Sequence, residues 1–275
     1  MSYTSAMFDE YLHAWNLIPD GIPITTRAAR LLPVRQNGAA AMLKVADHDD
    51  ERIGGSVMQW WNGEGAARVL ARDDIAILLE RAEGTASLAV MSRTGRDDEA
   101  CAILCTVAAR LHGHRSDPPP NLVPLVQWFR DIEPAVAKHG GILAACAQAA
   151  RVLLAEPRDV CVLHGDLHHN NVLDFGARGW LAIDPKHLIG ERSFDYANIF
   201  TNPDLDHPQW PVATNPERFT RRLEIVTDAA KIERTRMLRW ILAWTGLSAA
   251  WYLDDGDPAE VDLRVAELAS AELSR

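Results

Sequence analysis

Three short apolar runs separated by polar residues constrain the fold of this chain most, because they interrupt an otherwise helical pattern. The runs are residues 160–163, 172–173 and 180–183. Asp166 and Asn171 lie between the first two runs, and Asp184 ends the third. If the last two runs pair as a hairpin, Asn171 and Asp184 lie side by side. The pattern therefore predicts a small sheet that brings these polar side chains together.

The three polar side chains are typical of phosphoryl transfer. Mg²⁺ prefers oxygen ligands, so the Asn171 amide and the Asp184 carboxylate could hold one ion against substrate phosphates. Asp166, five residues before Asn171, is then free to accept a proton from a substrate hydroxyl. The same spacing occurs in the protein-kinase catalytic loop, which is also followed by a metal-binding aspartate. The sequence therefore predicts Asp166 as the catalytic base, with Asn171 and Asp184 as metal ligands.

The chain before residue 85 has mostly strand-like patterns. Four strands and one helix are predicted there, the strands at 28–34, 39–45, 67–71 and 75–80 and the helix at 49–61. Gln36-Asn37-Gly38 is a strong hairpin-turn signal between the first two strands. The glycine pair Gly54-Gly55 weakens the helical pattern, since glycine disfavours a helix interior.

Lys44 lies inside an apolar strand, where a charge is costly unless it is paired. A strand lysine held by a helix glutamate and reaching the α- and β-phosphates would explain this placement. Glu51, early in the predicted helix, is the preferred partner, and Glu64 is the second choice.

Further nucleotide contacts are expected around Lys44. The backbone of Glu80 and Ala82, in the linker at 78–82, would bond an adenine edge. No GxGxxG motif precedes Lys44, so Thr25 and Thr26 are expected to touch the phosphates instead.

Helical periodicity dominates after residue 95. Helices are predicted at 97–112, 128–138 and 142–154, and again beyond 216, while the acidic stretch 254–262 is expected to be a solvated turn. The chain then divides into a strand-rich nucleotide-binding lobe, residues 1–83, and a larger helical lobe for catalysis and substrate binding, residues 84–275.

Composition narrows the functional class. The formal net charge is −10, and phosphates would repel such a chain, which argues against nucleic-acid binding. Four cysteines without a CxxC pair do not form a disulfide framework. The most apolar stretch, 241–253, is too short to span a bilayer. We expect a soluble cytoplasmic protein that does not bind membranes.

Two other classes compete with a kinase. His164, Asp166, His168 and His169 could ligate zinc in a metallohydrolase. That interpretation leaves Lys44 without a role, and adjacent histidines in an extended loop tend to point apart. A non-catalytic nucleotide-binding module is the other alternative, and the intact set of lysine, asparagine and two aspartates argues against it.

The chain resembles the aminoglycoside phosphotransferases, and among them the streptomycin 6-phosphotransferase subgroup. The resemblance covers nearly the whole chain and is most specific in these stretches: 31–36, 41–45, 60–69, 164–173, 179–185, 194–200 and 244–251. Asn170 departs from the family pattern, which often has glutamate there. The resemblance implies an α+β, bilobal, protein-kinase-like fold, Mg²⁺ and ATP as cofactors, and phosphorylation of the 6-hydroxyl of streptomycin.

Streptomycin carries two guanidinium groups and a methylamine, so the resemblance also implies an acidic substrate cleft. Asp195, Glu191 and Asp204 are the expected substrate contacts, with Asp254-Asp255 as a further pair. Asp195 could instead cap a helix and hold the catalytic loop. A kinase of the same fold acting on hydroxyurea or an amino sugar is the nearest alternative.

Overall fold

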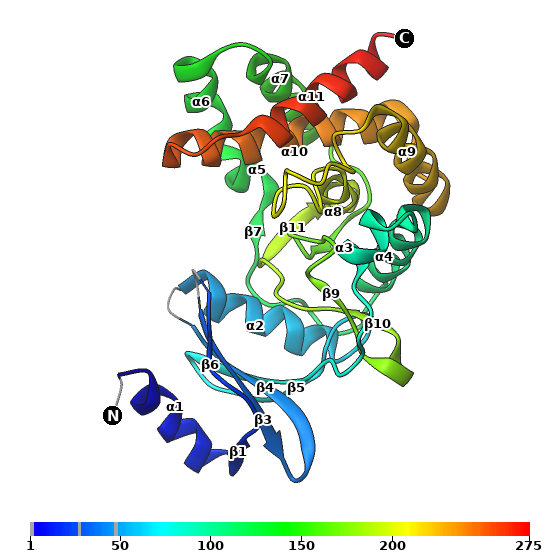
Figure 1. Cartoon of the computed structure of the whole chain (residues 1–275). Helices are drawn as coiled ribbons and strands as arrows, with labels where there is room; N and C mark the ends of the chain where they lie inside the picture. Colours follow the sequence, from blue (N-terminus) through cyan, green and yellow to red (C-terminus); the bar gives the residue numbers. More distant parts are fainter. Residues whose placement is uncertain (1–2, 27–28, 47–48) are drawn as a thin grey trace.

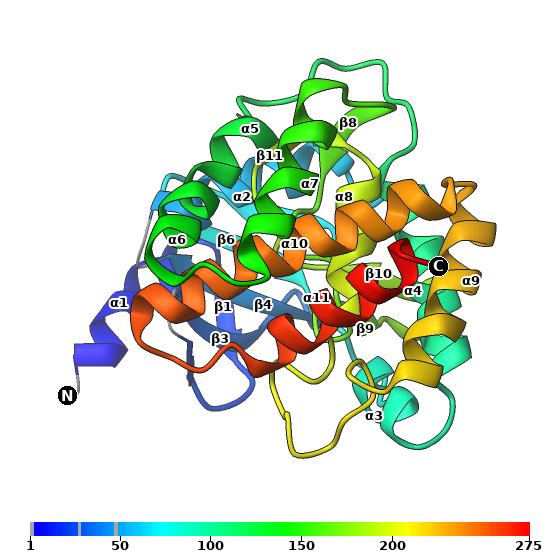
Figure 2. The same ribbon diagram turned by 90° about the horizontal axis from the view of Figure 1, so that it is seen from above.

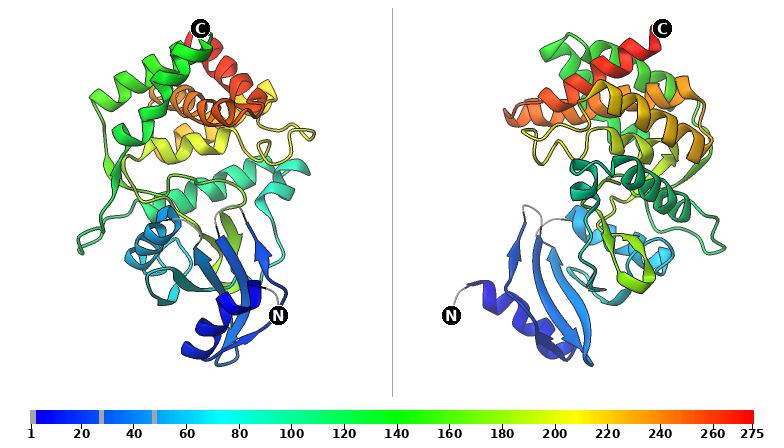
Figure 3. Two further views of the ribbon diagram at one scale, coloured as in Figure 1. Left: turned by 90° about the vertical axis from the view of Figure 1, so that its left-hand side faces the viewer. Right: turned by 45° about the vertical axis from the view of Figure 1, so that its right-hand side comes forward.

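The chain folds into two lobes in the computed structural model, which describes residues 3–26, 29–46 and 49–275. A sheet-rich N-terminal lobe lies below a larger helical lobe in Figure 1, and Figure 3 shows the same division from two other sides. The predicted α+β, bilobal architecture is confirmed. Among the described helices, none combines the length and apolar character needed to cross a bilayer.

One twisted sheet forms the framework of the N-terminal lobe. Its strands are β1 (Leu17–Pro19), β2 (Ile24–Thr25), β3 (Ala29–Gln36), β4 (Ala39–Ala46), β5 (Val69–Arg72) and β6 (Ala76–Glu80). Their order is β1-β3-β4-β6-β5, with β2 paired to β3. Asn37 and Gly38, with φ of 50° and 83°, make the predicted tight turn between β3 and β4.

Two helices cover this sheet. The helix α1 (Tyr3–Ala14) packs Phe8 and Tyr11 into an apolar cluster with residues of β3 and β4; the sequence analysis missed it among the surrounding strand patterns. The helix α2 (Asp49–Trp61) has the predicted bounds, and Figure 1 shows it between the sheet and the C-terminal lobe. Its residues Val57, Met58 and Trp61 join the core that extends into the C-terminal lobe.

The C-terminal lobe is built mainly from helices. They are α3 (Leu88–Arg93), α4 (Asp97–Leu111), α5 (Leu125–Trp128), α6 (Ile132–His139), α7 (Leu143–Ala155), α8 (Ser193–Ala197), α9 (Pro216–Ala230), α10 (Arg234–Asp255) and α11 (Glu260–Leu273). The long, largely buried α10 forms the centre, and Figure 2 shows it crossing the lobe between α7 and α11.

Two small sheets lie where the lobes meet. The strands β9 (Val172–Asp174) and β10 (Trp180–Ala182) form the predicted antiparallel hairpin, with Val172 opposite Ala182. The other sheet has the order β7-β11-β8, from β7 (Val123–Pro124), β11 (Leu188–Glu191) and β8 (Val160–Leu163). Ala67 N donates to Ala182 O at 2.9 Å, so the hairpin is also tied to the chain that follows α2.

Candidate active site

The β9–β10 hairpin places the predicted metal ligands at one end of a small sheet. Ile183 N donates to Asn171 O at 2.9 Å, so Asn171 and Asp184 leave the hairpin as neighbours. Asp184 has φ of 61°, a conformation that few side chains tolerate and that aspartate adopts more readily than most. The predicted hairpin is therefore present, and its register brings the backbone of these two residues together.

Asp166 lies beside Asn171 in the loop between β8 and β9. The Asn171 amide nitrogen donates to Asp166 O at 2.8 Å and to Asp166 Oδ2 at 3.2 Å. These bonds use the nitrogen, so the amide oxygen is the atom available to a cation. That oxygen and the Asp184 carboxylate make an all-oxygen donor set, which fits Mg²⁺ and its preference for one or two carboxylates together with substrate phosphates.

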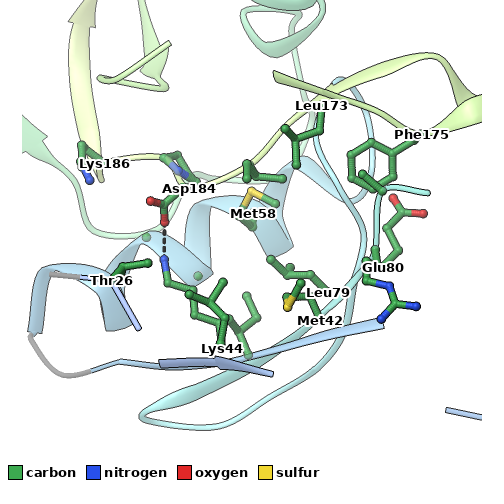
Figure 4. Close-up of a pocket in the computed structure, with 18 residues that line it drawn as sticks. Thr26, Met42, Lys44, Met58, Leu79, Glu80, Leu173, Phe175, Asp184 and Lys186 are labelled. Carbon is green, nitrogen blue, oxygen red and sulfur yellow. Dashed lines mark hydrogen bonds and ion pairs between the residues drawn. The ribbon is translucent and has the colours of Figure 1, made fainter. Parts of the chain in front are cut away.

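Lys44, on β4, forms an ion pair with Asp184 across the boundary between the lobes (Figure 4). The lysine side chain is 14% exposed, so the pair supplies the partner that its place in an apolar strand requires. The side chain of Glu51, its expected partner, lies outside the described residues. Glu64, the second choice, lies instead near Arg115, with 3.8 Å between the charged groups.

A cavity of about 550 Å³ extends from this ion pair to the linker. Figure 4 shows Lys44, Asp184 and Thr26 at one end of it and Glu80 and Phe175 at the other. Its apolar walls come from Met42, Met58, Leu79, Leu173 and Phe175, which the sequence analysis did not single out. An apolar slot with cations and a carboxylate at one end suits a nucleotide, with the base in the slot and the phosphates at Lys44.

The other predicted nucleotide contacts divide into two groups. Thr26 and Ala82 line the cavity, whereas Thr25 pairs with Arg30 in the sheet and is not among the lining residues. Glu80 lines the cavity too, but its carboxylate accepts from Arg68 N at 2.6 Å and pairs with Arg178. The Glu80 side chain therefore holds the linker against the C-terminal lobe.

A second pocket, of about 330 Å³, is lined by Asp166. Its lining is acidic and aromatic: Asp166, Asp206, Asp255, Asp257, Trp244, Trp251 and Tyr252, with His168, Asn202, Leu205 and Ser248. Such a lining suits a cationic acceptor, since carboxylates pair with cations and ring faces attract them. The sequence analysis named Asp255 but missed Asp206 and Asp257.

Asp195 does not face this pocket, contrary to its predicted role as a substrate contact. It is fully buried on α8, where its carboxylate accepts from His164 N at 2.9 Å and Gly165 N at 2.8 Å. His112 Nε2 lies 2.8 Å from the same carboxylate. Burial alone would raise the pKa of Asp195, but these partners hold it below its ordinary value. Asp195 fixes the backbone of the catalytic loop, which was the alternative interpretation.

Glu191 and Asp204 are also buried, so their predicted contact with substrate is wrong for the same reason. Glu191 is 1% exposed and accepts from Arg236 Nε at 2.7 Å and Trp240 Nε1 at 2.8 Å. Asp204 is fully buried and accepts from Val212 N at 2.9 Å and Thr214 N at 3.1 Å. Both carboxylates are hydrogen-bonded inside the C-terminal lobe, and neither side chain has an exposed surface that a ligand could contact.

The histidine cluster proposed for zinc does not assemble. Among the described residues, no group of three or more histidine, cysteine and acidic side chains is placed to hold a metal ion. His164 instead uses both ring nitrogens on backbone atoms, with Ile183 O at 2.8 Å and Asp166 N at 3.2 Å. Burial lowers the pKa of His164, and the two backbone contacts of its ring shape the loop.

A nucleotide-sized cavity at Lys44 and Asp184 and a second, acidic pocket at Asp166, both in a two-lobed fold, are features of a small-molecule kinase. Residues 14–256 match the family of aminoglycoside/hydroxyurea antibiotic resistance kinases, and the chain belongs to this family. A streptomycin 3″-kinase from Klebsiella pneumoniae is 55% identical over 94% of this chain and 98% of its own length. A streptomycin 6-kinase from Streptomyces griseus is 32% identical, covering 92% and 84%.

Solved structures agree on the fold. The aminoglycoside phosphotransferase APH(4)-Ia, in complex with ADP and hygromycin B, aligns with a TM-score of 0.70 at 14% identity, covering 96% of this chain and 98% of its own. The choline kinase LicA from Streptococcus pneumoniae aligns with a TM-score of 0.66 at 13% identity and covers 99% of both chains. The protein-kinase-like fold expected from the sequence is therefore confirmed.

Proposed function

We propose that this chain transfers the γ-phosphoryl group of ATP to a hydroxyl of streptomycin in the cytoplasm. Residues 1–83 would bind the nucleotide and residues 84–275 would bind the acceptor. The observation that carries the proposal is that Asp166 lines an acidic, aromatic pocket, while Lys44 and Asp184 line a separate cavity of nucleotide size. A polycationic acceptor would fit this pocket, with its hydroxyl at the Asp166 carboxylate.

Each residue has a defined part in this proposal. Asp166 accepts the hydroxyl proton, Lys44 binds the α- and β-phosphates, and Asn171 and Asp184 hold Mg²⁺. The bound ion neutralises phosphate charge. Because phosphoryl transfer has a loose transition state, catalysis rests mainly on positioning and charge stabilisation. The backbone of Glu80 and Ala82 would bond the adenine edge at the far end of the cavity.

The 3″-hydroxyl is the position that we favour, in place of the 6-hydroxyl expected from the sequence. The relative that shares 55% identity is a 3″-kinase, whereas the two 6-kinases share 32% and 31%. A hydroxyurea phosphotransferase from Kitasatospora aureofaciens is 31% identical and gives a second candidate acceptor. Hydroxyurea is small and neutral, so it would leave the acidic lining of a pocket of about 330 Å³ unused.

Mass spectrometry of streptomycin incubated with the protein and Mg-ATP tests the proposal. We expect a gain of one phosphate group. Phosphorus–proton coupling in the NMR spectrum of the product should place that group at the 3″ position. Asp166→Asn should lower kcat by about 10²–10⁴-fold with little change in ATP affinity, because only the proton acceptor is lost. Phosphate on hydroxyurea but not on streptomycin would overturn the choice of acceptor, and near-full activity of the variant would overturn the choice of base.

A further inference from the structure

Lys186 lies at the boundary between the nucleotide cavity and the acceptor pocket. It lines the cavity together with Lys44 and Asp184, and its Nζ is 3.9 Å from Asp166 Oδ2, which lines the acceptor pocket. Figure 4 shows Lys186 at the same end of the cavity as the Lys44–Asp184 ion pair. The chain has only four lysines, and two of them are at this cavity.

The backbone around Lys186 fixes it against the catalytic loop. Lys186 N donates to His164 O at 2.7 Å. Gly165 leaves room for its stem, since a Cβ on Gly165 would lie only 3.0 Å from Lys186 Cβ. Its side chain is 26% exposed, so the ammonium reaches solvent in the cavity while the stem is packed. These contacts fix the position of Lys186 relative to the loop that carries Asp166.

We infer that Lys186 is a further catalytic residue, which binds the γ-phosphoryl group as it passes from the nucleotide to the acceptor held at Asp166. The place follows from geometry: Lys44 and Asp184 mark the phosphate end of the cavity, Asp166 marks the acceptor hydroxyl, and Lys186 lies within reach of both. This inference rests on the proposed function in taking ATP as the donor and Asp166 as the residue at the acceptor hydroxyl.

The charge on Lys186 matches the chemistry of the step. The acceptor oxygen forms a bond to the γ-phosphorus, the bond from that phosphorus to the β,γ-bridging oxygen breaks, and its electron pair leaves with ADP. The hydroxyl proton goes to Asp166, and Lys186 stays protonated throughout. Negative charge spread over the transferring oxygens is stabilised by a fixed cation, and removal of one such donor typically costs about 10²–10³-fold in kcat.

Binding of ADP and of the non-hydrolysable analogue AMP-PNP, measured by calorimetry with Mg²⁺, tests this inference without any acceptor. In Lys186→Met, affinity for AMP-PNP should fall by about 10-fold or more, the worth of a charge-assisted hydrogen bond, while affinity for ADP stays unchanged. Lys186→Gln, which keeps a polar end group but loses the charge, should behave in the same way. Lys186→Arg should keep part of the preference for AMP-PNP.

Lys231→Met is the matched control, because Lys231 is exposed at the end of α9 and pairs with Asp228. It should bind both nucleotides as the unchanged protein does. Equal affinities of the Lys186→Met and unchanged proteins for AMP-PNP, or an equal loss for ADP and AMP-PNP, would overturn the inference. Because neither ligand requires streptomycin, failure of the proposed acceptor and failure of the Lys186 assignment give different results.

Discussion

Single carboxylates in this chain differ in role according to what their oxygens contact. Asp166 is about one-third exposed in the acceptor pocket, whereas Asp195, on the neighbouring α8, is fully buried. Both carboxylate oxygens of Asp195 are hydrogen-bonded, to the backbone N–H groups of His164 and Gly165 and to the ring of His112. A sequence shows both residues as acids near a catalytic loop, but only the folded structure shows that one is open to a substrate.

The variant Asp195→Asn tests whether Asp195 positions the catalytic loop or contacts the substrate. The amide offers one acceptor oxygen, so one of the two catalytic-loop N–H groups would face a donor, and an unpaired buried group costs about 1–3 kcal/mol. We expect kcat to fall by about 10-fold or more, since 1.4 kcal/mol corresponds to a factor of ten. The KM for streptomycin should be unchanged, because Asp195 does not line the acceptor pocket.

Steady-state kinetics at varied streptomycin concentration measures this split between kcat and KM. Asp228→Asn, at an exposed residue of α9, is the control and should match the unchanged protein. A rise in KM with kcat retained would mean that Asp195 contacts the acceptor after all.

At the scale of helices and strands, the sequence predicted those elements and pairings whose signals lie within a few residues of one another. The Asn37-Gly38 turn predicted the β3–β4 hairpin. The apolar runs on either side of the turn at 176–179 predicted the pairing of β9 with β10, which brings Asn171 near Asp184. Contacts between distant segments were not predictable in this way. Glu191 is paired with Arg236, 45 residues away, and no local pattern shows that pairing.

The contact between α10 and α11 gives another example, because Asp262 was expected in a solvated turn and is fully buried. Burial raises the pKa of Asp262 to about 7, and the Ser248 hydroxyl offsets only part of this effect. The folded protein therefore holds a proton that the unfolded chain releases at lower pH.

This proton gives a stability prediction. Between the ordinary value of 3.8 and about 7, the folded state binds more protons, so the contribution of Asp262 to stability falls as pH rises and is constant above about 7. The change from 3.8 to about 7 corresponds to about 4 kcal/mol as an upper bound. Asp262→Asn cannot ionise, so its advantage over the unchanged protein should grow from pH 5 to pH 8.

Urea unfolding of both proteins at several pH values measures that difference. Asp228→Asn, which alters an exposed carboxylate, corrects for general charge effects. A difference between the Asp262→Asn and unchanged proteins that stays constant across this pH range would show that Asp262 is ionised in the folded state.

At the scale of the whole molecule, the two lobes meet through the close approach of α2 to Pro185, the residue after Asp184. A Cβ on Gly54 would lie 2.5 Å from Pro185 O, a distance that real Cβ atoms do not show. This close contact explains why a glycine stands at position 54 inside a helix: any larger side chain would separate the lobes, although it would favour the helix more than glycine does. The same contact sets the width of the nucleotide cavity, which Gly54 and Pro185 both line.

Gly54→Ala should therefore weaken ATP binding. Alanine favours a helix over glycine by about 1 kcal/mol, so a loss cannot come from α2 itself. The added methyl group meets a backbone carbonyl that cannot turn aside, so α2 must move away from Asp184 and carry the lobe with it. Gly55→Ala makes the same chemical change one residue later, where the new Cβ would meet only side-chain ends of Arg72 and Ile77, each at 3.2 Å. Calorimetric titration with AMP-PNP should show weaker binding for Gly54→Ala than for Gly55→Ala, and equal affinities would mean that the lobes can separate at this point without cost to the nucleotide site.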